Sequence, residues 1–246
     1  MALVPFIVTG SARSGSSLIL LTLGRHPAIL AAGELFHPDP TQREQNHAVR
    51  AGGSAQAFDP DAEDAVRFVE RTVWSPRRGI AAAGFKMFVY HETTRGADGL
   101  LSRLAREHPD LRVIHARRRN YLDMWVSLKK AEITGLWAAT SRASGPELDP
   151  IAADAPQLQN YFEAIEAADD RVASLVSPDR YLAVDYERLS ANYEEAVSSV
   201  FDFLGVEAKL GPPPLAKQNR QPHSHFLANY AQLADHFAGS RFSWFF

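Results

Sequence analysis

Residues 5–27 read PFIVTGSARSGSSLILLTLGRHP, and this stretch decides the fold. A short apolar run, Phe6 to Val8, leads into a turn rich in glycine and serine, Gly10–Ser17, and then into leucines at helical spacing. A strand, a small-residue turn and a helix in this order cradle phosphate, because backbone N–H groups close around the anion and the helix N-terminus adds partial positive charge. The sequence therefore predicts an anion-binding loop at Gly10–Ser17, with a ligand-free tight turn as the alternative.

The cation in this loop differs from that of ordinary triphosphate-binding loops. Gly10 and Gly15 have the spacing of the pattern G-x-x-x-x-G-K-[ST]. Ser16 stands where the pattern has lysine, and Arg13 is the only cation in the turn. We therefore expect the loop to hold a phosphate-like group without ordinary ATP or GTP hydrolysis.

Composition narrows the class of protein. The 246 residues suit one large α/β domain, residues 1–246, better than two small domains. The chain has no cysteine, so a disulfide framework and a thiolate metal site are excluded. A net charge of −3 argues against a general nucleic-acid partner, so any anion site must depend on local cations. The start of the chain does not resemble a secretory signal. No apolar run approaches the roughly 20 residues that span a bilayer. Both observations favour a cytoplasmic protein without a membrane span.

Strand-like and helix-like segments alternate along the chain. Besides the first strand, we expect strands at Ala81–His91, Leu111–Ala116 and Arg180–Val184, and helices at Gly99–His108, Tyr121–Leu136, Gln157–Val176, Glu194–Leu204 and His225–Phe237. This alternation predicts an α/β fold of the P-loop type, with a parallel sheet of about four to five strands and helices on both faces. Two irregular stretches, residues 36–61 and 140–156, exceed the usual loop length and predict lids or acceptor-binding loops.

Polar residues follow the predicted strands, where ligands of such sheets bind. They are His91-Glu92, Arg117–Asn120 and Asp185–Glu187, in addition to the Gly10–Ser17 loop. The basic run after residue 116 begins a helix, where positive charge opposes the helix dipole unless an anion binds. We interpret Arg119 and Ser127, eight residues apart, as donors to a second phosphate on one side of that helix, with a solvated basic helix start as the alternative.

These motifs together resemble those of the sulfotransferases that use 3′-phosphoadenosine 5′-phosphosulfate (PAPS), and most closely the bacterial carbohydrate-type branch. The 5′-phosphosulfate motif R/K-S-G-T/S-T/S is matched by residues 13–17, RSGSS. The 3′-phosphate motif R-N-x-x-D-x-x-x-S is matched by residues 119–127, RNYLDMWVS. A segment similar to Y-E-D-L, DYERL at residues 185–189, precedes FLG at residues 203–205, so the resemblance spans residues 6–206.

The resemblance implies an enzyme that moves the sulfuryl group of PAPS to a hydroxyl of a small-molecule or carbohydrate-like acceptor, without a metal. Arg13 is implied to touch the bridging oxygen and the leaving phosphate. Leu18 stands where the cytosolic branch has its adenine-stacking tryptophan, which favours the carbohydrate-type branch. The implied donor-binding residues are Ser11, Ala12, Arg13, Ser14, Gly15, Ser16, Ser17, Arg119 and Ser127, with Lys217, Gln218 and Arg220 in a basic C-terminal segment whose alternative is a solvated tail.

The general base has two candidates by resemblance. Glu34, in AAGELF, matches the glutamate of the carbohydrate branch, and His91 matches the histidine of the cytosolic branch. Lys86 lies inside an apolar strand, where lysine is rarely buried alone, so it either reaches to the sheet edge or helps to hold the sulfonate. A P-loop nucleoside or nucleotide kinase and a non-catalytic nucleotide-binding module remain as alternatives, and the oligomeric state stays open.

Overall fold

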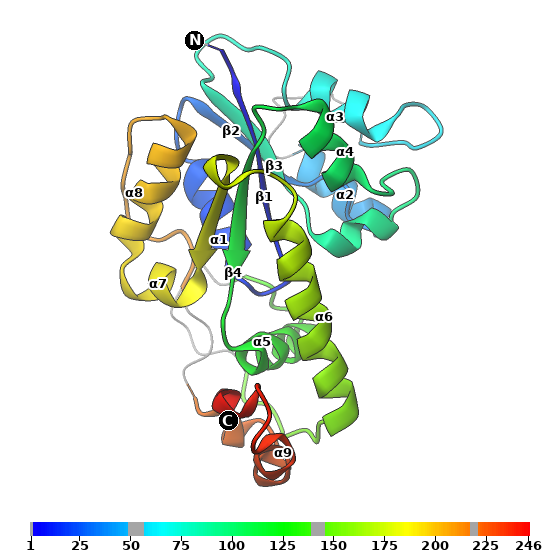
Figure 1. The fold of residues 1–246 in the computed structure, drawn as a ribbon, viewed down its shortest axis with the longest axis vertical. Helices are drawn as coiled ribbons and strands as arrows, with labels where there is room; N and C mark the ends of the chain where they lie inside the picture. The colour runs from blue at the N-terminus through cyan, green and yellow to red at the C-terminus, as the bar shows by residue number, and fades with distance from the viewer. Residues whose placement is uncertain (1, 49–56, 139–145, 217–220) are drawn as a thin grey trace.

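The computed structural model describes residues 2–48, 57–138, 146–216 and 221–246. Five parallel strands form one sheet in the order β2-β3-β1-β4-β5 (Figure 1). Their bounds are β1 Val4–Gly10, β2 Ile29–Glu34, β3 Ala82–Lys86, β4 Arg112–Arg117 and β5 Tyr181–Asp185. The predicted parallel α/β sheet is therefore confirmed.

Helices cover both faces of this sheet. Successive residues of β1 point to opposite faces, so Phe6 packs with α1 (Ser16–Leu23) and α8 (Tyr193–Leu204), whereas Ile7 faces the other side. That second face carries α3 (Ala65–Thr72), α4 (Leu100–Glu107) and α6 (Ala155–Ala173). Figure 1 shows the two helical layers on either side of the sheet.

A third apolar cluster lies at the carboxyl end of the strands. It joins α5 (Tyr121–Thr134), α6 and α9 (Tyr230–Phe237) through buried side chains that include Leu122, Phe162 and Phe237. Figure 1 shows α5 and α9 below the sheet, beyond the end of β4. This cluster fixes α5 over the edge at which ligands of parallel sheets bind.

Several predicted boundaries were wrong. Strand β2 was missed because its sequence, ILAAGE, is rich in alanine and glycine, which have low strand propensity. The strand predicted at Ala81–His91 ends at Lys86, and a 3₁₀ helix, η1 (Val89–Thr93), follows it. A short helix, α7 (Tyr186–Ala191), starts directly after β5.

The two long irregular stretches are not simply loops. Residues 36–61 contain α2 (Pro40–Ala48), and residues 140–156 run into the first turn of α6. Parts of both stretches lie outside the described residues, so their role as lids or acceptor loops stays a prediction. Among the described residues, every helix is too short or too polar to cross a membrane.

Candidate functional site

The sheet register brings polar residues together at the carboxyl edge. Glu34 of β2 pairs with Lys86 of β3, and Arg117 of β4 pairs with Asp185 of β5. Between these two pairs, Gly10 ends β1 beside Ala116. Residues from five strands thus meet where the sequence predicted a ligand site.

Both glycines of the Gly10–Ser17 loop are required by close approach. Gly10 has φ +139°, and a Cβ there would lie 2.2 Å from the carbonyl oxygen of Ala116. Gly15 has φ +95°, and a Cβ there would lie 2.8 Å from the ring of Tyr186. These contacts press the loop against β4 and α7, so any larger side chain would displace it.

The loop carries unused hydrogen-bonding capacity. The first amides of a helix have no intrahelical partner, and Gly15, at the N-cap of α1, supplies no side-chain cap. The Ser14 hydroxyl is buried without a hydrogen-bond partner among the described residues. Ser11 and Ser16 are buried as well, whereas Ala12 and Ser17 are half-buried. A loop with several such donors at a helix N-terminus fits a phosphate-like anion.

Arg13 links this loop to α5. Its Nε donates to Ser127 Oγ at 2.9 Å, and its Nη1 donates to the carbonyl oxygen of Trp137. Arg13 has φ +69° and is the only non-glycine residue with positive φ among those the structure describes. Residues held in such strained backbone conformations often lie at functional sites. Burial, and then repulsion from Arg118, lower the pKa of Arg13. The guanidinium therefore lies in a partly dehydrated, positively charged setting suited to an anion.

The predicted pairing of Arg119 with Ser127 does not rest on helical spacing. Arg119 precedes Asn120, the N-cap of α5, so it lies outside the helix. Its side chain is 68% exposed and forms an ion pair with Asp185 at 2.7 Å. Ser127 is buried and accepts from Arg13 instead. The structure thus joins Ser127 to Arg13 of the loop and turns Arg119 toward Asp185 of β5.

Arg118 is a buried cation that the sequence did not single out within Arg117–Asn120. It is 6% exposed, lies over the ring of Tyr186 at 4.6 Å and pairs with Asp123 at 2.8 Å. Asp123 also accepts from His223 at 2.7 Å. Burial works against the charge on Asp123, but the hydrogen bond from His223 and the charge of Arg118 lower its pKa to about 2. Arg118 is buried and Arg119 is exposed, as expected for an extended chain, but the sequence does not show which of the two points inward.

Lys86 joins the loop to Glu34. Its side chain is 7% exposed, forms an ion pair with Glu34 Oε1 and donates to Ser17 Oγ at 2.8 Å. Lys86 therefore does not reach into solvent, and its position beside the loop leaves contact with a sulfonate as the prediction to test.

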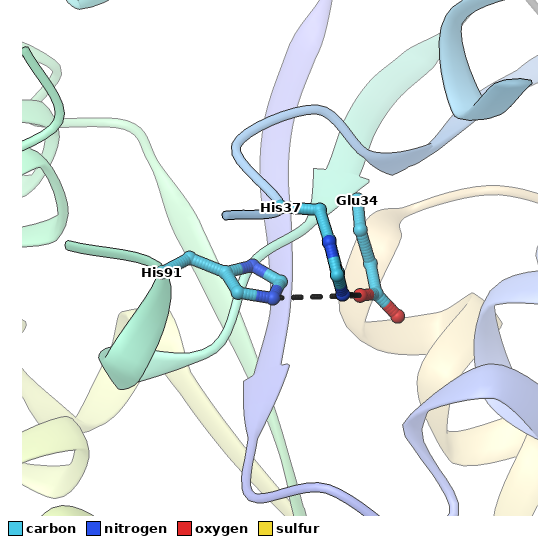
Figure 2. A group of neighbouring side chains, drawn as sticks. All are labelled: Glu34, His37 and His91. Carbon is cyan, nitrogen blue, oxygen red and sulfur yellow. Dashed lines mark ion pairs between the residues drawn. The ribbon is translucent and has the colours of Figure 1, made fainter. Parts of the chain in front are cut away.

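The two candidate bases occupy one cluster. His91 Nε2 lies 3.4 Å from Glu34 Oε2, and His37 Nε2 lies 3.9 Å from the same oxygen. Figure 2 shows both imidazole rings turned toward this carboxylate. His91 Nδ1 accepts from the Phe88 N–H at 3.3 Å, and His37 Nδ1 accepts from the Asp39 N–H at 3.0 Å. These backbone contacts occupy the Nδ1 lone pair of each ring, so Nε2, on the side of Glu34, carries a proton.

The cluster holds Glu34 ionised. Burial alone would raise the pKa of Glu34, but hydrogen bonds from His91 and Lys86 and the charge of Lys86 lower it to about 2. Burial is also the main cause that lowers the pKa of His91, against the attraction of Glu34. The site therefore combines a carboxylate with a neutral imidazole and an ammonium.

Glu34, His37 and His91 also place one possible metal-ligand atom each within 4.8 Å of one another. Because each Nε2 carries its ring's proton, neither imidazole offers a lone pair toward Glu34. The Lys86 ammonium binds the same carboxylate. The arrangement fits two imidazole donors around the Glu34 carboxylate better than a set of metal ligands. That the enzyme works without a metal stays a prediction.

The predicted basic C-terminal residues Lys217, Gln218 and Arg220 lie outside the described residues. The described part of the chain resumes at Gln221, and His223 then contacts Asp123 of α5. This contact anchors the segment that follows residue 220 to α5.

Comparisons with known proteins bear on the family and the fold of this chain. A model described as "Sulfotransferase family" matches residues 5–209. Nodulation protein H of Rhizobium meliloti is 25% identical over 250 aligned residues, covering 98% of this chain and 94% of that protein. The same protein of strain 1021 is 24% identical with the same coverage. The crystal structure of a sulfotransferase from Alicyclobacillus acidocaldarius has a TM-score of 0.56 at 17% identity, covering 95% of this chain and 90% of its own, which supports the fold.

Proposed function

This chain belongs to the sulfotransferase family, and we propose that it moves the sulfuryl group of PAPS to a hydroxyl of a small or carbohydrate-like acceptor. That the protein is a sulfuryl-transferring enzyme follows from the family, whose model covers most of the chain. The identity of the donor and the class of acceptor are the parts that we propose.

One observation carries the choice of donor. The loop motif and the α5 motif meet at a hydrogen bond from Arg13 Nε to Ser127 Oγ at 2.9 Å. PAPS carries a phosphosulfate and a separate 3′-phosphate, so it needs two neighbouring anion sites. The loop amides and Ser14 would hold the phosphosulfate, and Ser127, with a cation of the 117–119 run, would hold the 3′-phosphate. A triphosphate-binding loop would instead need the lysine that Ser16 replaces.

The reaction is an in-line displacement at sulfur. The acceptor oxygen forms a bond to sulfur while the bond from sulfur to the bridging oxygen breaks, and the electron pair stays with the leaving phosphate. Arg13 and the loop amides stabilise the charge that develops on this phosphate. The proton of the acceptor hydroxyl passes to a carboxylate oxygen of Glu34. Positioning and charge stabilisation then supply most of the acceleration.

Glu34 fits the role of base better than His91. The Nδ1 lone pair of His91 accepts a backbone N–H, and its Nε2 proton faces Glu34. The imidazole is fully buried, so neither nitrogen is open to a substrate hydroxyl. We therefore assign His91 as a positioning residue that holds the Glu34 carboxylate.

Binding of the spent donor tests this proposal without knowledge of the acceptor. Millimolar 3′-phosphoadenosine 5′-phosphate (PAP) is expected to raise the thermal unfolding midpoint, because a ligand that binds only the folded state stabilises it. Arg13→Ala is expected to reduce the rise. The absence of any stabilisation of the wild-type protein by PAP would contradict the proposed donor.

A further inference from the structure

A buried ammonium connects the donor loop with the general base. Lys86 Nζ donates to Ser17 Oγ at 2.8 Å and forms an ion pair with Glu34 Oε1. Its side chain is 7% exposed, and Nζ lies 4.8 Å from the centre of the Phe88 ring. An ammonium so far removed from water requires a counter-charge, and Glu34 supplies it.

We propose that Glu34 and the sulfuryl group of the donor compete for the Lys86 ammonium, so that donor binding releases Glu34 to act as the base. The inference rests on the proposed function, since it takes PAPS as the donor. It assigns Lys86 a second role besides contact with the sulfonate, namely to keep the base weak until the donor is present.

The position of Ser17 makes this competition physically reasonable. Ser17 is the last residue of the loop that binds the anion, and its hydroxyl already contacts Lys86. A sulfuryl group in this loop brings three further acceptor oxygens next to the same ammonium. Lysine has a flexible four-carbon stem and three N–H donors, so its head can turn from Glu34 to a new anion without moving the strand.

Other titratable groups also face Glu34. His91 and Tyr90 face it from η1, and His37 faces it from the turn after β2. The two imidazoles are held toward Glu34 by backbone N–H groups, so they continue to orient the carboxylate after Lys86 has moved. Loss of the ammonium removes the strongest full charge beside Glu34 and raises its proton affinity, as a general base near neutral pH requires.

Donor affinity reports this competition without any turnover. The dissociation constants of PAPS and PAP are measured by calorimetry for the wild type, Glu34→Gln, Lys86→Met, Lys86→Arg and the two double variants that combine Glu34→Gln with each Lys86 substitution. Glu132→Gln is the matched control, because Glu132 pairs with Lys129 at 2.7 Å on an exposed part of α5. Lys86→Arg, which keeps the charge, shows whether an effect of Lys86→Met reflects charge or misfolding, and circular dichroism checks the fold of each variant.

If Glu34 competes with the sulfuryl group, Glu34→Gln binds PAPS at least about fivefold more tightly than the wild type, a usual size for coupled binding. This gain in PAPS affinity from Glu34→Gln persists when residue 86 is arginine and disappears when it is methionine. The gain is smaller for PAP, which lacks the sulfuryl group. Equal tightening in the Lys86→Met background would overturn the inference, because it would reflect direct repulsion between Glu34 and the donor. Unchanged PAPS affinity in Glu34→Gln would overturn it as well. A wild-type protein that binds neither nucleotide would instead contradict the proposed function.

Discussion

Glu34→Gln gives the sharpest test of the electrostatics of this site, through folding stability. The pKa of Glu34 falls from 4.5 to about 2, because hydrogen bonds from His91 and Lys86 outweigh the cost of burial. Each pKa unit corresponds to about 1.4 kcal/mol, so the ionised carboxylate stabilises the fold by about 3 kcal/mol. Its side chain is only 19% exposed, so solvent screens little of this energy.

The sign of the pH dependence follows from the direction of the change. A carboxyl whose pKa is lower in the folded state stabilises the protein above its unfolded pKa, and this contribution is lost as the pH falls through the folded pKa. The stabilisation by Glu34 is therefore complete well above pH 4.5 and is lost toward pH 2. About 1 kcal/mol of it is already lost at pH 4.

Urea denaturation at pH 7 and pH 4 measures this effect. We expect the wild type to exceed Glu34→Gln by about 3 kcal/mol in free energy of unfolding at pH 7, and this advantage to be smaller by about 1 kcal/mol at pH 4. Glu132→Gln, in an exposed pair, should change stability by less than about 1 kcal/mol at either pH. A wild-type advantage over Glu34→Gln of the same size at both pH values would refute the reasoning, since glutamine does not titrate.

Three further outcomes follow from the site. Glu34→Gln should lower kcat by about 10²-fold or more, as expected for the loss of a general base, whereas His91→Gln should lower kcat by less than about tenfold. Steady-state kinetics measures both values, and a larger loss of kcat in His91→Gln would contradict our assignment. Arg119→Ala should weaken PAP binding about tenfold, whereas Arg117→Ala should weaken it less than about twofold. Calorimetry measures both affinities. Equal effects of the two substitutions would indicate that Arg119 stays paired with Asp185 when the nucleotide binds. Sulfuryl transfer should continue in the presence of EDTA, because N–H donors hold the Glu34 carboxylate. Loss of sulfuryl transfer in EDTA, with recovery on added Mg²⁺, would instead indicate metal-dependent chemistry of the kinase type.

The sequence predicted those parts of the site that depend on local order. The Gly10–Ser17 loop follows from a strand, a small-residue turn and a helix that are adjacent in the chain, and both glycines prove necessary for close approach. The parallel sheet follows from alternating segments, and the family agrees with the resemblance of the ordered motifs. That agreement removes the support for the kinase and the non-catalytic module as alternatives.

Contacts between distant segments were beyond the reach of the pattern. The pairing of Glu34 with Lys86 depends on the register of β2 on β3, and β2 itself was hidden by its alanines. Our proposal of Glu34 rather than His91 as the base rests on which ring nitrogen of His91 accepts a backbone N–H, and only the turn after β3 determines that contact. Arg118 was overlooked because three consecutive arginines look alike until the chain direction at the end of β4 is known.

Transfer of radiolabelled sulfate from PAPS tests the central claim most directly. The wild-type protein is incubated with labelled PAPS and a panel of alcohols, phenols and sugars, beside Arg13→Ala. We expect label to appear on a hydroxyl of at least one acceptor with the wild type, and turnover to be lost with Arg13→Ala, because Arg13 is the cation that joins the loop to Ser127. Binding of PAPS without transfer to any member of the panel, or full activity of Arg13→Ala, would contradict the account.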